Sequence, residues 1–332
     1  MAENMNTTEQ ILLKAEGLNK KFSISTGTGF RKLSYYAVRD LSLEIRKGEI
    51  FGLVGESGCG KSTLGSMLLG LQKPDSGKIL FDGKDMTKLG AAKLKELRKD
   101  IQTVFQDPYD SLDPRFTLKQ IMEEPLIVQH IGPAEKRMEI ISSLLERVDI
   151  PADFMNRYPH QLSGGQRQRL CIARALTLSP RFLILDEAVS ALDVSVQAQV
   201  INLLLDLKEQ LELTYLFISH DLSIVKFMSD RIAVMYFGRI VELADKHVLS
   251  RSMRHPYTRA LFLAMPEPDP DIPVQVTHIE AGVPSLIHPP GGCAFHPRCP
   301  YATERCRREA PKLKEIAEGH LVACHLSSEP LF

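Results

Sequence analysis

The sequence predicts an α/β protein built on a parallel β-sheet. Two apolar runs, Phe182–Leu185 and Tyr215–Ile218, have the composition of strands buried on both faces, and the amphipathic stretch Gln197–Leu211 lies between them. A third run, Ile50–Val54, leads into a glycine-rich segment and then into a helical pattern over Leu64–Leu71. Strand, helix and strand at this spacing are typical of a doubly wound sheet.

Composition places the chain among ordinary globular proteins and gives no sign of a nucleic-acid partner. The 332 residues are 44% hydrophobic and 25% charged, and 41 Lys and Arg balance 41 Asp and Glu. There is therefore no overall basic field to attract nucleic acid. The first ten residues lack the basic start and apolar stretch of a signal peptide, and no apolar run reaches the roughly 18 residues that span a bilayer. We expect a protein that folds in the cytoplasm and docks on a membrane protein.

Regions outside the predicted parallel sheet have their own patterns. Residues 11–49 show short alternating stretches, which predict an antiparallel hairpin region. Residues 106–170 are mostly helical in pattern with proline breaks, as in an inserted helical subdomain. After about Arg254 the chain becomes rich in proline and then in cysteine, so we expect a small separate C-terminal module.

The segment Gly55–Thr63 reads Gly-Glu-Ser-Gly-Cys-Gly-Lys-Ser-Thr and matches a phosphate-binding loop between a strand and a helix. Its glycines let backbone N–H groups point at an anion, and the helix adds its positive N-terminal end. Lys61 would contact the β- and γ-phosphates, while the Ser62 hydroxyl would bind Mg²⁺.

Further polar side chains follow predicted strands. Asp186 and Glu187 end the apolar run 182–185, where Asp186 would hold Mg²⁺ and Glu187 would polarise the attacking water. Gln106 follows another strand-like run and could reach the metal and the water, and His220 follows the run 215–218 and could contact the γ-phosphate. We expect these side chains to gather where the strands of an α/β sheet bind ligands.

A second glycine-rich helix start occurs at Leu162-Ser163-Gly164-Gly165-Gln166. Ser163 and the glycines before a strongly helical run make another N-terminus suited to an anion. Two such sites for one nucleotide are explained if the second serves a nucleotide held mainly by a partner molecule.

With these motifs in order, the chain resembles the ATP-binding subunits of ABC transporters. The matching parts are the Walker A loop 55–63, the Q-loop Gln106, the signature 162–166, the Walker B pair 186–187, the D-loop Ser190–Asp193 and the switch His220. The resemblance implies an ABC-type P-loop ATPase with a RecA-like parallel sheet core, an antiparallel β subdomain and a helical signature subdomain at about 107–170, together spanning 11–253. Residues 254–332 would form the Cys-rich extension. Ala188 stands where the family usually has proline.

The resemblance also implies a head-to-tail dimer with two ATP molecules, each between Walker A of one subunit and the signature of the other. The residues that it assigns to ATP are Phe22, Gly55, Ser57, Gly58, Cys59, Gly60, Lys61, Ser62 and Thr63, with Ser163, Gly164, Gly165 and Gln166 acting in trans. Phe22 would stack on adenine, with Tyr35 and Tyr36 as other candidates. The assigned Mg²⁺ ligands are Ser62, Gln106 and Asp186, the catalytic residues are Glu187, Gln106 and His220, and Asp193 belongs to the D-loop.

The tail extends the resemblance to the dipeptide and oligopeptide transporter ATPases, because Arg254–Leu261 and the following proline-rich link and cysteines look like their C-terminal extension. The implied function is the ATPase of a membrane importer for dipeptides or oligopeptides, peripheral on the cytoplasmic face of the membrane. Its implied partners are a second homologous ATPase (or a second copy), two transmembrane permease subunits and, indirectly, an extracytoplasmic binding protein. Importers of nickel, glutathione or another small solute, and a soluble non-transport ABC ATPase, remain alternatives.

Four of the six cysteines, Cys293, Cys299, Cys306 and Cys324, lie close together in the tail. A reducing cytoplasm disfavours disulfides, so buried structural thiols or a four-thiolate metal site are the better interpretations. Thiolate chemistry alone does not separate Zn²⁺ from an iron–sulfur cluster, and the spacing matches neither common pattern. The resemblance to peptide-transporter ATPases implies a [4Fe–4S] cluster, with zinc as the alternative.

Overall fold

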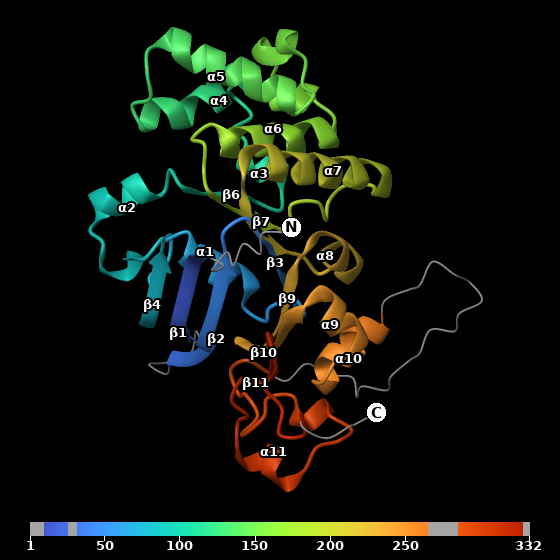
Figure 1. The fold of residues 1–332 in the computed structure, drawn as a ribbon. Coiled ribbons are helices and arrows are strands. Elements are labelled where there is room, and N and C mark those ends of the chain that lie inside the picture. The colour runs from blue at the N-terminus through green and yellow to red at the C-terminus, as the bar shows by residue number, and fades with distance from the viewer. Residues whose placement is uncertain (1–9, 26–31, 265–284, 328–332) are drawn as a thin grey trace, which may run out of the picture. The chain divides into compact units, whose positions relative to one another are not determined.

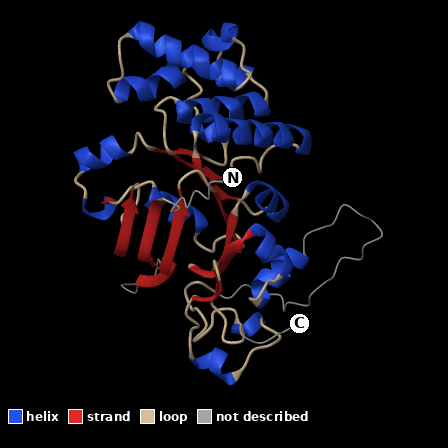
Figure 2. Ribbon diagram, viewed as in Figure 1, coloured by secondary structure: helices blue, strands red, loops and turns tan. Residues whose placement is uncertain are grey.

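A computed structural model describes residues 10–25, 32–264 and 285–327, which form two compact units (Figures 1 and 2). The first unit contains residue 10 together with 46–50 and 88–218, and the second contains 11–45, 51–87 and the described residues from 219 onward. Each unit has its own sheet strands and helices, and each is described by itself.

Three parallel strands form the sheet of the first unit, in the order β8-β7-β6. They are β6 (Ile101–Val104), β7 (Phe182–Asp186) and β8 (Thr214–Ile218). Every residue of β8 is buried, as expected for a strand covered on both faces. The helix α7 (Val194–Leu211) connects β7 to β8, so the predicted strand–helix–strand unit is confirmed.

The rest of the first unit is helical. Helices α4 (Leu118–Val128), α5 (Ala134–Arg147) and α6 (Gly164–Leu176) pack against one another (Figure 1). Each buries one apolar stripe, which is the pattern that makes an amphipathic helix stable in a protein. The shorter elements are α2 (Ala91–Leu97), α3 (Pro108–Ser111) and the 3₁₀ turns η2 (Ala152–Asn156) and η3 (Pro159–Gln161).

An antiparallel sheet of order β2-β1-β4-β5 belongs to the second unit. Its strands are β1 (Ile11–Ser25), β2 (Lys32–Arg46), β4 (Ser76–Phe81) and β5 (Lys84–Asp85), and the turn η1 (Met86–Lys88) follows. The residues predicted as an antiparallel hairpin region are thus two long neighbouring strands.

The second unit also contains a strand set of order β11-β12-β10-β9-β3. β3 (Ile50–Val54) pairs in parallel with β9 (Arg231–Tyr236), while β10 (Arg239–Asp245), β12 (His320–Val322) and β11 (Lys314–Ala317) continue with antiparallel pairing. The helices are α1 (Lys61–Leu68), α8 (Leu222–Met228), α9 (Lys246–Arg251), α10 (Pro256–Leu263) and α11 (Glu304–Arg308), with the turn η4 (His296–Arg298).

The C-terminal residues differ from the expectation of a separate module. Strand β12 pairs with β10 through Glu242 opposite Val322 and Leu243 opposite Leu321, so the tail extends the sheet of the second unit. Glu242 is fully buried and its carboxylate accepts the backbone N–H groups of Arg254 and His255, with His320 Nε2 at 2.8 Å. The tail therefore shares a core and a buried polar network with the residues before it. In the described part of the chain, no helix has the length and apolarity needed to cross a bilayer.

Candidate functional site

The phosphate loop, Gly55–Thr63, connects the fully buried strand β3 to helix α1 in the second unit. Gly55, Gly58 and Gly60 have φ values of 156°, 78° and 111°. A Cβ on Gly60 would overlap the carbonyl oxygen of Ala37 and lie 2.9 Å from Met235 Cε, so this position needs glycine for its backbone and for its space. No side chain caps α1 in the described structure, because its N-cap is Gly60. The helix start therefore offers backbone donors to a ligand.

Lys61 lies inside this loop, with 5% of its surface exposed. Its ammonium donates to the carbonyl oxygens of Gly55, at 2.7 Å, and Glu56, at 3.1 Å. The carbonyl oxygens of the loop thus hold this cation in place. Cys59 is buried beside it and burial raises the pKa of its thiol, so the residue acts as a small neutral side chain in the loop. Ser57, Gly58 and Ser62 are exposed, and Thr63 is half-buried.

The candidate adenine-stacking residues lie on β1 and β2. The rings of Phe22 and Tyr35 have centroids 5.9 Å apart, and the Lys20 ammonium lies 5.8 Å from the Phe22 centroid. Tyr36 is 41% exposed, with Lys21 and Arg39 cations each 5.6 Å from its ring centroid. Both groups offer an aromatic face, so the choice of Phe22 stays a prediction.

His220 follows β8 on the loop to α8 and is exposed. The neighbouring Ser219 donates its N–H to Leu53 at 3.4 Å, and its hydroxyl accepts the N–H of Asp221 at 3.0 Å. Asp221 in turn caps α8. The loop that carries the imidazole is thus fixed on both sides within the second unit.

In the first unit, Gln106 and the Walker B carboxylates leave the same edge of the sheet. Val104 pairs with Leu185 in parallel register, so Gln106, two residues after β6, and Asp186, the last residue of β7, lie at adjacent carboxyl ends. Gln106 is exposed. Glu187 adopts a left-handed backbone, with φ 50°, and its N–H donates to the carbonyl of Ile218 at 2.9 Å. A non-glycine residue held in this region is typical of functional sites, because the surroundings must impose it.

Within the first unit, the signature lies beside the D-loop residue Leu192 and the first turn of α7. A Cβ on Gly165 would lie 2.5 Å from Val196 Cγ1, and one on Gly164 would lie 3.8 Å from Leu192 Cδ2. Ser163 caps α6 by accepting the N–H of Gln166, whose side-chain oxygen accepts the N–H of Ser163 at 3.0 Å. Asp193 caps α7 through the Val196 N–H at 3.0 Å, and this bond, with that of the Ser195 hydroxyl, lowers the pKa of its carboxyl group.

The predicted metal centre is not confirmed. All six cysteines are free, and among the described residues no group of three or more His, Cys, Asp or Glu side chains is placed to hold a metal ion. Two of the tail cysteines are joined through their backbones, because Cys293 donates its N–H to the Cys306 carbonyl at 2.8 Å. Burial, and then the charges of the other three thiolates, raise the pKa of Cys324 to about 11.

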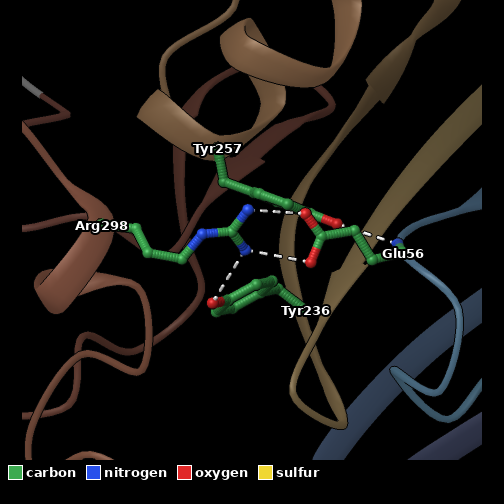
Figure 3. Close-up of polar contacts among 4 residues, drawn as sticks. All are labelled: Glu56, Tyr236, Tyr257 and Arg298. Carbon is green, nitrogen blue, oxygen red and sulfur yellow. Dashed lines mark hydrogen bonds and ion pairs between the residues drawn. The ribbon is translucent and has the colours of Figure 1, made fainter. Parts of the chain in front are cut away.

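Sequence reasoning missed a polar cluster that joins the phosphate loop to the C-terminal residues (Figure 3). The guanidinium of Arg298 faces the carboxylate of Glu56 with both terminal nitrogens, and it also contacts the Tyr236 hydroxyl. The backbone N–H of Glu56 donates to the Tyr257 hydroxyl. Glu56 and Arg298 are 242 positions apart, and no motif spacing pairs them.

Comparison with known proteins gives two family matches. Residues 38–190 match the ABC transporter family, and residues 241–306 match the oligopeptide/dipeptide transporter C-terminal region. The chain is 49% identical over 324 residues to the oligopeptide transport ATP-binding protein AppF of Bacillus subtilis, covering 96% of this chain and 98% of that protein. It is 47% identical over 317 residues to a peptide import ATP-binding protein of Brucella ovis, with the same coverage.

Solved structures give the same fold. A dimeric ATP-binding cassette in a post-hydrolysis state, bound to ADP and phosphate, aligns with a TM-score of 0.63 at 30% sequence identity, covering 70% of this chain and 98% of that one. The cbiO1 protein of Clostridium perfringens, part of an ABC transporter complex, aligns with a TM-score of 0.63 at 30% identity, covering 73% and 92%.

Proposed function

The chain belongs to the ABC transporter family of ATP-binding proteins, and on that premise we propose that the phosphate loop binds ATP and that Glu187 acts as the general base of hydrolysis. The main support for the proposal is the geometry of the loop. Its helix start is uncapped, its glycines adopt backbone angles that other residues avoid, and its buried lysine is already held by two carbonyls.

The other side chains take roles that suit their chemistry. Ser62, Asp186 and Gln106 supply hydroxyl, carboxylate and amide oxygens, which are the hard ligands that Mg²⁺ prefers. Bound Mg²⁺ supplies positive charge against the charge that develops on the phosphates. Glu187 polarises the attacking water, Gln106 orients it and His220 contacts the γ-phosphate. We propose that Ser163–Gln166 contact an ATP held by a second subunit.

We propose peptide import as the transported process, because relatives that match nearly the whole chain are named for peptide import and oligopeptide transport. The chain would lie on the cytoplasmic face of the membrane, head-to-tail with a second homologous ATPase or a second copy and beneath two permease subunits. Residues 11–253 would be the ATPase domain, with a helical subdomain at about 107–170, and residues 254–332 its extension. The cargo is tested by measuring how fast the assembled transporter takes up labelled dipeptides, compared with nickel and with glutathione.

The ATPase roles are tested by substituting Glu187→Gln and Lys61→Ala. Glu187→Gln should lower kcat by about 10²–10⁴-fold, the usual contribution of a general base, while the Kd for ATP stays near that of wild type. Lys61→Ala should raise the Kd for ATP by about 10–100-fold, because a charge-assisted contact is lost. Glu209→Gln, an exposed carboxylate on α7, is the matched control. Undiminished hydrolysis by Glu187→Gln would rule it out as the base, and unchanged affinity in Lys61→Ala would rule out its phosphate contact.

We further propose that Cys293, Cys299, Cys306 and Cys324 bind a [4Fe–4S] cluster. The proposal rests on the resemblance and on the backbone hydrogen bond between Cys293 and Cys306, since the described side chains are not gathered as a metal site. Anaerobic purification with iron, sulfide and zinc analysis tests it, with Cys299→Ser as the variant and Cys171→Ala, a buried cysteine of α6, as the control. We expect about four irons and four sulfides per chain in the wild type and in Cys171→Ala, and their loss in Cys299→Ser. Stoichiometric zinc or no metal would contradict it.

A further inference from the structure

Glu56, the second residue of the phosphate loop, forms a two-pronged ion pair with the C-terminal residues. Arg298 Nη1 lies 3.0 Å from Glu56 Oε2, and Nη2 lies 2.9 Å from Oε1 (Figure 3). The arginine and glutamate side chains are 11% and 26% exposed. A planar guanidinium that contacts both carboxylate oxygens and is partly shielded from water is among the stronger polar contacts that proteins make.

The backbone of Glu56 is held by two further residues. Its N–H donates to the Tyr257 hydroxyl at 2.9 Å, and its carbonyl accepts the Lys61 ammonium at 3.1 Å. Glu56 thus connects the lysine of the phosphate loop to Tyr257 and Arg298. A shift of this peptide would move a carbonyl that holds the Lys61 ammonium.

The two C-terminal contacts are themselves well fixed. Tyr257 is fully buried, and its ring centroid lies 4.5 Å from that of Tyr236 and 5.5 Å from that of Phe295. Arg298 donates to the Tyr236 hydroxyl at 3.4 Å and ends the turn η4 that begins just after Phe295. Packed aromatic rings with paired hydroxyls give a rigid support for the ion pair.

The charge of Glu56 explains why such a support would be needed. A carboxylate in a phosphate-binding loop lies well within one Debye length of the triphosphate charges, so it repels the ligand unless a cation offsets it. The guanidinium of Arg298 covers both carboxylate oxygens of Glu56, so Lys61 does not have to neutralise that carboxylate. The Lys61 ammonium donates only to neutral carbonyl oxygens in the hydrogen bonds described above, and its positive charge remains available to the phosphates.

We propose that Arg298 is a positioning residue for ATP binding: it neutralises Glu56 and, together with Tyr257, fixes the phosphate loop in its binding geometry. Tyr257 and Arg298 both lie in the segment 241–306 that matches the transporter C-terminal region. The extension thus sets the affinity of the ATPase for its nucleotide, in addition to any role in transport. This inference rests on the proposed binding of ATP at the loop.

A double-mutant cycle tests the inference through the Kd for ATP and through the KM and kcat of hydrolysis. Arg298→Met keeps most of the apolar stem and should raise Kd and KM about tenfold, because it leaves Glu56 unpaired, while kcat changes less than about twofold. Glu56→Gln should bind ATP at least as tightly as wild type. The double variant Glu56→Gln/Arg298→Met should recover most of the affinity that Arg298→Met loses, since the uncompensated carboxylate is gone.

Control variants separate a specific loss of ATP affinity from a loss of folding. Arg305→Met removes an exposed arginine of the same tail, paired with Glu309, and should leave all three constants unchanged. Arg298→Lys keeps the charge and loses the fork, so its affinity should fall between those of wild type and Arg298→Met. Thermal unfolding of each variant shows whether it is folded at the assay temperature.

Two results would overturn the inference. One is an Arg298→Met protein that is folded and binds ATP with the wild-type Kd. The other is a double variant that binds ATP as weakly as Arg298→Met or more weakly, which is the result of a purely structural role. Failure of the proposed function is distinguishable, because in that case Lys61→Ala also binds ATP normally.

Discussion

The two glycine-rich helix starts of this chain look alike in sequence and differ in structure. The phosphate loop leads into α1 with Gly60 as N-cap, no side-chain cap among the described residues and a buried lysine in its first turn. The signature leads into α6 with Ser163 as N-cap and a reciprocal pair of hydrogen bonds to Gln166. The first leaves its helix start for a ligand, and the second satisfies its own donors.

This difference suits the two roles proposed for these helix starts. The proposed phosphate loop keeps its backbone donors uncapped, places glycines where other residues would be strained, and holds the Lys61 ammonium beside them. The signature satisfies its own donors, which suits its proposed contact with an ATP held by a second subunit. Helix α10 is a third case, since the buried ring of His255 caps it by accepting the Tyr257 N–H at 3.1 Å.

The largest effect is expected from Gly60→Ala. The added Cβ meets the Ala37 carbonyl and forces a side chain into φ 111°, so the loop must shift and the Kd for ATP should rise on the order of 100-fold. Gly58→Ala is the control, because φ there is 78° but nothing lies within 4 Å of the new Cβ. Equilibrium binding measures the Kd for ATP of both variants. Equal Kd values would show that the steric clash at Gly60 is not what weakens binding.

The second-largest effect is expected from acid, which should lower the stability of the folded chain through His255, the N-cap of α10. Burial lowers the pKa of His255 to about 4 from an ordinary 6.5, against the opposing charge of Glu242. The unfolded chain then binds the proton more readily, so this stabilisation is complete above pH 6.5 and is lost as the pH falls toward 4. The free energy of unfolding should drop by roughly 3 kcal/mol over that range.

His255→Asn should remove this part of the pH dependence while keeping a capping oxygen, and His247→Asn, on an exposed histidine of α9, should leave it intact. Denaturant unfolding between pH 4 and 7 is the measurement. The same acid-induced loss in His255→Asn as in wild type would show that another group carries it.

The smallest effects on the chain itself are expected at the signature. Ser163→Ala should cost about 1 kcal/mol of stability through the lost cap. Gly164→Ala should cost little, because its Cβ meets only Leu192 at an ordinary 3.8 Å. Neither should change the Kd for ATP of the isolated chain, while both should lower turnover of the assembled ATPase. A weakened Kd in the isolated chain would place the signature at the same subunit's nucleotide.

Local patterns predicted much of the fold. The apolar runs at 182–185 and 215–218 are in strands β7 and β8. They were predictable because a strand that is buried on both faces is a short, continuous run of apolar residues. The glycine loop was predictable for the same local reason, since its backbone angles exclude most other residues.

Long-range pairing was not predictable in this way. The three-residue strand β12 carries too weak a pattern to reveal that it joins β10, and so the tail was expected to stand apart. Arg298 and Glu56 are ordinary charged residues in sequence, and only the fold brings them together. The left-handed backbone of Glu187 is likewise imposed by its surroundings, because glutamate itself does not favour it.

The most direct test of the central claim is hydrogen exchange of the Glu187→Gln protein with and without Mg-ATP, first at a dilution where the chain is monomeric and then with its partner ATPase or at a concentration where copies associate. We predict that ATP protects the amides of residues 56–62 in both samples and those of residues 163–166 only in the associated one. Protection of residues 163–166 in the monomer, or none of residues 56–62 in either sample, would contradict the assignment of the two helix starts to different molecules.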